Sequence, residues 1–196
     1  MAEAAAPPTY QCLLNESFYQ QGQGGQVKPY CSLFLPGDSG NGVEYPGQQT
    51  NFMQFWVLLD QNPLNPPQQF ASPDSSTVPA GLSQLMDSNH LLVAGFAGAG
   101  TQAPSGDLFN FMMANGSGPM LTALDQLNSN LACGVFAMAF YGMASIPGQG
   151  PASGIEFLDY PAYVTYADGT QTSWQGALPF TLMPDGTGGY VPIASL

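Results

Sequence analysis

The sequence predicts a mainly β protein, an antiparallel sandwich or distorted barrel with one or two short helices. Apolar and aromatic runs of strand length recur along the chain, and 24 Gly and 18 Pro divide them into short segments. Two Asp-Gly pairs, at 168–169 and 185–186, stand between strand-like segments, where such pairs favour the tight turns of β-hairpins. Many short strands separated by turn signals are typical of sandwiches and barrels.

The N-terminus is predicted to be an arm that precedes one domain. Residues 1–8 are rich in Ala and Pro and lack the charged and apolar regions of a signal peptide, so we expect a flexible arm there. The remaining residues, 9–196, are enough for a single β-rich domain. Its first two strands are expected at 9–20 and 27–35, on either side of a turn rich in Gly and Gln.

The middle of the chain alternates between apolar runs and irregular connections. Residues 36–47 contain a Gly-Asp-Ser-Gly sequence and predict a loop. The aromatic run 52–59 and the aliphatic run 91–97 each predict a buried strand. Residues 61–79 contain five Pro, so we expect a long surface connection without regular structure.

Two helices and a further buried strand are predicted between these runs and the C-terminal third. The first helix is expected at 79–88, with Thr77 as its cap. The second is expected at 119–128, where Leu121, Leu124 and their neighbours follow helical spacing. The uncharged run 131–146 is shorter than the roughly 20 residues that span a bilayer, and we expect a buried strand.

The C-terminal third predicts two hairpins. Residues 163–174 are expected to fold around the first Asp-Gly pair, which sets Tyr163 opposite Trp174. The segments 177–183 and 190–193 are expected to pair around the second one.

Charge is the most unusual feature of the composition. Charged residues make up 7% of the chain, against about 25% in an ordinary soluble domain. Thirteen Asp and Glu face a single cation, Lys28, which leaves a formal net charge of -12. Nucleic-acid binding, adhesion to anionic membranes and phosphoryl transfer all depend on Lys or Arg, so we expect none of these activities. With almost no ion pairs available, stability is expected to improve as carboxylates are protonated below about pH 5.

The three cysteines carry no recognisable pattern. Cys12, Cys31 and Cys133 are widely spaced, which predicts neither a metal site nor a disulfide framework. Cys12 and Cys31 could form a disulfide in a secreted protein, and buried free thiols are the alternative.

Carboxylates provide two candidate sites. Glu156 and Asp159 are the acids that a hydrolase would need as a pair, although positions three apart in a strand point to opposite faces. Asp38, Asn41 and Glu44 offer oxygen ligands for Ca²⁺ without the spacing of an EF-hand. We expect no metal and no cofactor.

Two further candidates involve side chains of other kinds. Tyr163 and Trp174 would form a platform for a sugar ring, unless both face the core. The segment around Ser39 resembles the nucleophile motif of trypsin-like proteases. However, His90, the one histidine, follows this serine instead of preceding it, so we expect a simple turn.

These observations favour a non-enzymatic, self-associating structural, coat or assembly protein with an uncharged, amide-rich surface. Its expected partner is further copies of itself, in an extracellular or particle-associated location. The alternatives are a carbohydrate-binding module that recognises a glycan and an acid-active hydrolase that uses a carboxylate pair.

Overall fold

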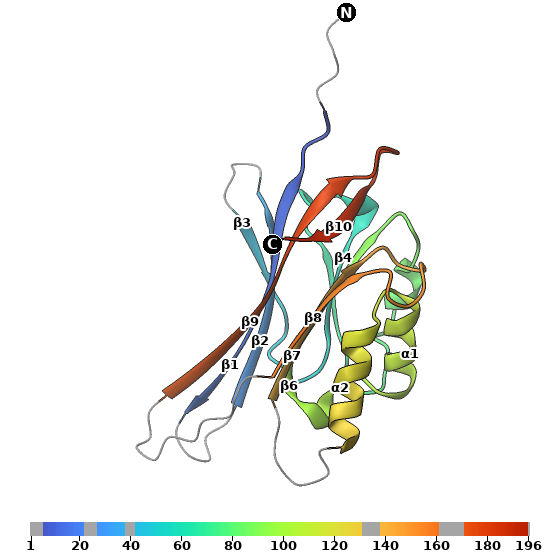
Figure 1. Cartoon of the computed structure of the whole chain (residues 1–196). Coiled ribbons are helices and arrows are strands. Elements are labelled where there is room, and N and C mark those ends of the chain that lie inside the picture. Colours follow the sequence, from blue (N-terminus) through green and yellow to red (C-terminus); the bar gives the residue numbers. More distant parts are fainter. Residues whose placement is uncertain (1–5, 22–26, 38–41, 131–137, 161–170, 196) are drawn as a thin grey trace, which may run out of the picture.

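The computed structural model describes residues 6–21, 27–37, 42–130, 138–160 and 171–195. In these residues, ten strands form two five-stranded antiparallel sheets that pack face to face, and two α-helices cover the outer face of one sheet (Figure 1). No sheet in the described parts of the chain closes on itself, so the mainly β prediction is confirmed in its sandwich form.

We call the two sheets A and B. Sheet A has the strand order β10-β9-β1-β2-β3 and contains β1 (Tyr10–Gln21), β2 (Val27–Pro36), β3 (Gly42–Pro46), β9 (Gln171–Pro184) and β10 (Tyr190–Ala194). Sheet B has the order β5-β4-β6-β7-β8 and contains β4 (Gln54–Leu58), β5 (Gln68–Ala71), β6 (Leu91–Ala99), β7 (Met138–Ser145) and β8 (Ile155–Asp159). The helices are α1 (Gly106–Ala114) and α2 (Pro119–Asn130), and short 3-10 turns lie at η1 (Leu59–Gln61), η2 (Leu82–Leu85) and η3 (Gly100–Gln102).

Sheet B is buried on both faces. In β6, Val93 belongs to the core between the sheets, whereas its neighbours Leu92 and Ala94 belong to the core beneath the helices. The same alternation occurs in β4 and β7, and Figure 1 shows both helices on the side of sheet B that faces away from sheet A. A strand buried on both faces has to be apolar throughout, which explains the uninterrupted apolar runs of these segments.

Sheet A is buried on one face only, and its sequence alternates accordingly. In β1, Cys12, Leu14 and Phe18 are buried against sheet B, while Gln11 is exposed and Leu13 is half-buried on the outer face.

Glycines let the two sheets approach closely at the centre of the sandwich. A Cβ atom at Gly142 would lie 2.7 Å from a methyl group of Leu14, and one at Gly176 would lie 2.9 Å from the Cβ of Phe140. Phe140 in turn stacks on Phe18 with ring centroids 4.9 Å apart. The missing side chains therefore make room for the large apolar groups of the opposite sheet.

Two strands occupy segments that were expected to be irregular, and these expectations are wrong. β3 lies in the predicted loop 36–47, and β5 lies in the predicted connection 61–79. Both are short strands at the edge of a sheet. An edge strand has a partner on one side only and tolerates neighbouring Gly and Pro, so it lacks the apolar pattern of a central strand.

The helices agree with the prediction in part. The helix expected at 119–128 is confirmed as α2, whereas the one expected at 79–88 shortens to η2 because Gly81 turns the chain with φ +85°. α1 was not predicted. Its buried residues, Leu108 and Met112, have helical spacing, but nine residues give too short a signal without the contacts of the folded state.

The other expected strands are recovered wherever the structure describes them. The hairpin around the second Asp-Gly pair is confirmed, with Pro184 of β9 opposite Tyr190 of β10. The run 131–146 contains β7, although 131–137 lie outside the described residues. Most of the hairpin predicted at 163–174 also lies outside them, and its last four residues open β9, which pairs with β1.

The close approach of the sheets generates a testable prediction. Gly176→Ala should lower the free energy of unfolding by about 1–3 kcal/mol, because the added methyl group must displace Phe140. Urea denaturation followed by tryptophan fluorescence measures this change. Gly42→Ala is the matched control, since the nearest atom to its new Cβ is 3.7 Å away. Equal stability of both variants would contradict the packing argument.

Candidate functional site

Glu156 anchors the start of α2. Its Oε1 accepts hydrogen bonds from the backbone N–H of Gly118 at 2.8 Å and from the hydroxyl of Tyr141 at 2.6 Å, and its Oε2 accepts one from the N–H of Met120 at 3.2 Å. A carboxylate at the N-terminus of a helix satisfies free N–H groups and interacts favourably with the helix dipole. Glu156 of β8 therefore caps α2 from a strand that is distant in the sequence.

The structure does not bring Asp159 to Glu156. Glu156 lies opposite Met143 and bonds the helix layer, whereas Asp159 lies opposite Phe140 at the exposed end of β8. Three residues separate the two acids along one strand, so their side chains leave opposite faces of sheet B.

The other predicted site residues are only partly within the described chain. Asp38, Asn41 and Tyr163 lie outside it, as does the side chain of Trp174, whose backbone pairs with Phe18 of β1. Glu44 is exposed in β3 and accepts a hydrogen bond from the hydroxyl of Tyr30. In the described ranges, no group of three His, Cys, Asp or Glu side chains has the arrangement of a metal site.

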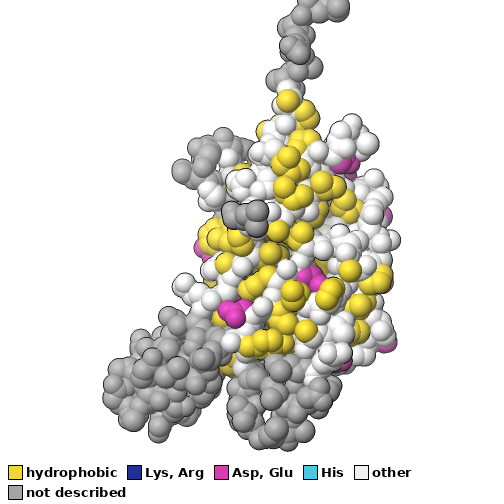
Figure 2. Space-filling view, in the orientation of Figure 1, with side chains coloured by type: hydrophobic (Ala, Val, Ile, Leu, Met, Phe, Trp, Pro, Cys, Tyr) yellow, Lys and Arg dark blue, Asp and Glu magenta, His cyan; other side chains and the backbone are white. Residues whose placement is uncertain are grey.

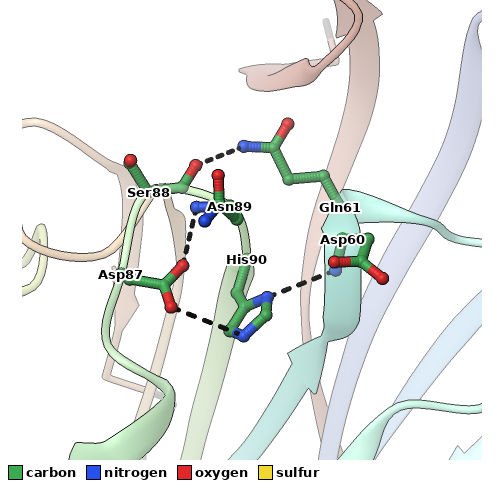
Figure 3. Close-up of polar contacts among 6 residues, drawn as sticks. All are labelled: Asp60, Gln61, Asp87, Ser88, Asn89 and His90. Atoms are coloured by element: carbon green, nitrogen blue, oxygen red, sulfur yellow. Dashed lines mark hydrogen bonds and ion pairs between the residues drawn. The ribbon is translucent and has the colours of Figure 1, made fainter.

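Ser39 also lies outside the described residues, and His90 has a structural role. Its Nδ1 accepts a hydrogen bond from the backbone N–H of Asp60 at 3.2 Å, and its Nε2 lies 3.7 Å from a carboxylate oxygen of Asp87 (Figure 3). This histidine ties the segment before β6 to the η1 turn.

Glu16 is a buried acid that the sequence analysis did not single out. It lies on β1, the central strand of sheet A, and its Oε1 accepts a hydrogen bond of 2.9 Å from the N–H of Phe96 on β6, the central strand of sheet B. Its side chain is fully buried, and its Oε2 has no hydrogen-bond partner. Burial raises the pKa of Glu16 well above its ordinary value, although the bond from Phe96 acts in the opposite direction. The period-2 pattern of β1 puts Glu16 in line with the buried Leu14 and Phe18, and this signal could have identified it.

The cysteines near this acid are free thiols. Cys31 lies opposite Glu16, four residues along β1 from Cys12. That offset corresponds to about 13 Å along a strand, beyond the Cα separation of about 7 Å that a disulfide tolerates. The disulfide alternative is therefore wrong, and burial raises the pKa of the Cys12 thiol to about 12.

The outer face of sheet A is almost free of charge. Among the described residues, Lys28 and Glu44 are the charged side chains on this face, because Glu16 points inward. Leu13 lies between Pro179 of β9 and Phe34 of β2, and these three residues form an apolar row across the sheet.

The apolar surface continues toward the edge formed by β10. There Met183 lies opposite Val191, and both Met183 and Ile193 are more than one third exposed. Figure 2, which views the side with β8, β9 and β10 in front, shows hydrophobic and uncharged side chains with a few separate acidic groups. The remaining acids of the described chain lie on sheet B, the helices and the loops.

A polar cleft of about 500 Å³ lies at one end of the sandwich, between the η1 turn, the segment before β6, the loop after β7 and the β9–β10 turn. Asp60 and Gln61 form one wall and have consecutive positive φ values of 53° and 52°. This conformation costs about 1–3 kcal/mol for each residue and persists only where the surroundings hold it.

The side chain of Gln61 supplies much of that support. Its Nε2 donates to the carbonyl oxygen of Ser88 at 2.9 Å (Figure 3), and its Oε1 accepts from the N–H of Tyr190 at 2.6 Å. Gln61 thereby connects three walls of the cleft.

Comparison with known proteins identifies no relative. No protein-family model, curated protein or solved structure matches the chain. Among the described residues, neither α1 nor α2 has the length and apolar character to cross a bilayer.

The buried acid predicts a characteristic pH dependence. The folded state keeps a proton on Glu16 at pH values where the unfolded chain has lost it, so the stabilisation is complete below about pH 4.5 and is lost as the pH rises. The free energy of unfolding should fall by up to about 1.4 kcal/mol per pH unit as the pH rises. We expect a smaller fall in Glu16→Gln, because the amide resembles the neutral acid. Denaturation between pH 5 and 8 measures it, with Glu44→Gln as the exposed control. If the stability of the wild type and of Glu16→Gln changed with pH in the same way, the raised pKa of Glu16 would be contradicted.

The anchoring role of Glu156 predicts unequal effects of two similar substitutions. Glu156→Gln should lower the free energy of unfolding by about 1–3 kcal/mol, because an amide replaces one acceptor in front of the N–H groups of α2. Asp159→Asn should change it by less than about 0.5 kcal/mol, because this side chain is exposed. Chemical denaturation of both variants tests the contrast, and a larger loss for Asp159→Asn would refute it.

Proposed function

We propose that this protein is a structural subunit that self-associates through the outer face of sheet A. The observation that carries the proposal is the distribution of charge, because the described acids other than Glu44 and the buried Glu16 lie on the other surfaces of the molecule.

A net charge of -12 opposes the association of identical chains. Two copies have the lowest repulsion when they meet through surfaces that carry no carboxylates, since Coulomb energy falls with the distance between charges. The outer face of sheet A comes close to this condition, because its one carboxylate among the described residues is that of Glu44, which lies on the edge strand β3 opposite Phe34 and is bonded to Tyr30.

The same face offers apolar area of a suitable size. The five strands of sheet A have 12, 10, 5, 14 and 5 residues. With a spacing of about 4.8 Å between strands and about 3.3 Å per residue, the face covers roughly 24 Å across the strands and roughly 30 Å along them. Interfaces of stable complexes bury about 800 Å² on each partner, which is of the same order. The row formed by Pro179, Leu13 and Phe34 would lie near the centre of such an interface, with Asn, Ser, Gln and Thr side chains around it.

The edges of sheet A are less suited to association by strand addition. β10 contains Pro192, and β3 has five residues between Gly42 and Pro46. Proline and short length both discourage the pairing of edge strands from two chains. Contact through the face of sheet A is therefore the favoured geometry.

Introducing a carboxylate into this face tests the proposal. We expect the wild type to sediment as oligomers at micromolar concentration and Ile193→Glu to sediment more as the monomer. The reason is that the new carboxylate would face the same carboxylate of the second copy across the interface. Sedimentation velocity over a range of protein concentrations gives the measurement. We also expect wild-type association to strengthen between 10 mM and 0.5 M NaCl, since salt screens the repulsion between copies.

Leu64→Glu is the matched control, because Leu64 is 41% exposed and Ile193 is 43% exposed, and Leu64 lies in the connection before β5. This variant should associate like the wild type. A wild-type protein that stays monomeric at every salt and protein concentration would end the proposal, and equal effects of both variants would move the interface elsewhere.

A further inference from the structure

We propose that the polar cleft at the end of the sandwich binds a neutral saccharide. This inference is independent of self-association and concerns a site away from the outer face of sheet A. It also differs from the predicted platform of Tyr163 and Trp174.

The cleft has the size and position of a small-molecule site. Its volume of about 500 Å³ lies within the range of about 300–1,000 Å³ that is typical of ligand pockets. Its walls come from loops of both sheets, so residues far apart in the sequence face a common space.

Uncharged hydrogen-bonding groups dominate the available side chains. Ser88, Asn89 and Gln149 line the cleft, and their side chains make no hydrogen bond within the described protein. The carboxylate of Asp60 also has no hydrogen-bond partner among the described residues, while its backbone N–H donates to His90. These groups combine donors and acceptors, which matches sugar hydroxyls because each hydroxyl both donates and accepts.

The composition of the cleft disfavours anionic ligands. Lys28 is the one Lys or Arg of the chain, and it lies opposite Tyr19, near the far end of β1 from Tyr10. Tyr10 marks the end of β1 near the cleft, because its ring lies 5.4 Å from that of Tyr190, whose N–H bonds Gln61. The nine residues of extended strand between Tyr10 and Tyr19 correspond to about 30 Å. A phosphate or sugar acid in the cleft would therefore meet no cationic side chain.

The second carboxylate is not available to a metal ion. Asp185 already accepts hydrogen bonds from the N–H and the hydroxyl of Thr187, both at 2.7 Å, and from the N–H of Gly189 at 2.9 Å. Hydrogen bonds from the hydroxyl and the N–H of Thr187 lower the pKa of Asp185. Ca²⁺ needs six to eight oxygen ligands, and Asp60 alone offers a free carboxylate among the described residues that line the cleft.

The turn that carries the free carboxylate is held in place before any ligand arrives. The positive φ values of Asp60 and Gln61 orient this turn, and the bonds from the turn to His90, Ser88 and Tyr190 fix it. Fixed polar groups reduce the entropy that a ligand loses on binding. A carboxylate with two free oxygens can accept from two neighbouring hydroxyls of a sugar ring.

Saturation-transfer NMR with the full chain tests the site. The probes are glucose, galactose, mannose and their neutral trisaccharides, with galacturonate as the charged comparison. Because Ca²⁺ has no proton signal, binding of CaCl₂ alone is measured by titration calorimetry. We expect transfer to at least one neutral saccharide and none to galacturonate. Asp60→Asn should weaken the binding about tenfold or more, because it removes the charge from the group that accepts hydrogen bonds from the sugar hydroxyls. The turn should be preserved, because Asn tolerates the positive φ.

Asn89→Ala provides a second variant that leaves the turn unchanged, and it should also weaken the binding. Asp107→Asn is the matched control, since it removes the same charge from an exposed position in the first turn of α1, away from the cleft. Several results would overturn the proposal: absence of transfer to every neutral saccharide, stronger binding of galacturonate, a response to CaCl₂ alone, or an equal loss in Asp107→Asn. The oligomeric state of each sample is measured in parallel. A failure of saccharide binding can then be distinguished from a failure of self-association.

Discussion

Sheet B packs against sheet A through one face and against α1 and α2 through the other, and the remaining features of the molecule depend on this double burial. It requires strands that are apolar on both faces, such as β6, where all residues from Leu91 to Gly98 are buried. It also leaves sheet A as an outer layer with one covered face and one open face. The position of the helices therefore determines which surface of the protein is free for contact.

The scarcity of cations changes how the acids of this protein are stabilised. The described chain contains one ion-pair contact, between His90 and Asp87. Instead, backbone N–H groups donate to the carboxyl groups of five residues, namely Glu16, Asp74, Asp87, Glu156 and Asp185. The expectation that acid stabilises the fold needs refinement on this basis. The raised pKa of Glu16 makes the fold more stable at lower pH. In contrast, hydrogen bonds lower the pKa values of Asp74 and Asp185 below their ordinary 3.8, so the stabilisation that these two carboxylates provide is lost when the pH falls below that value.

The two proposed contact surfaces use the uncharged side chains in different ways. The outer face of sheet A presents apolar residues in register across neighbouring strands, which suits a flat contact with a second copy. The cleft presents amides, a hydroxyl and one free carboxylate on loops, which suits a small polar ligand. Because the cleft opens at the end of the sandwich, association through the sheet face would leave it accessible in the assembly.

The local pattern of the sequence was enough for the elements that carry their own signal. The central strands, α2 and the Asp-Gly turn between β9 and β10 follow from apolar periodicity and from the conformational preference of glycine. The edge strands β3 and β5 and the short helix α1 did not follow from it, because neighbouring elements supply most of their stabilising contacts. The sites depended even more on the tertiary structure: Glu156 meets Met120 of α2 across 36 residues, Glu16 meets Phe96 across 80, and Gln61 meets Tyr190 across 129. Composition alone determined that this protein must make its contacts with few charges, whereas only the packing of two sheets and a helix layer decided where the uncharged groups gather, because hydrogen bonds between distant segments leave no periodic trace in a sequence.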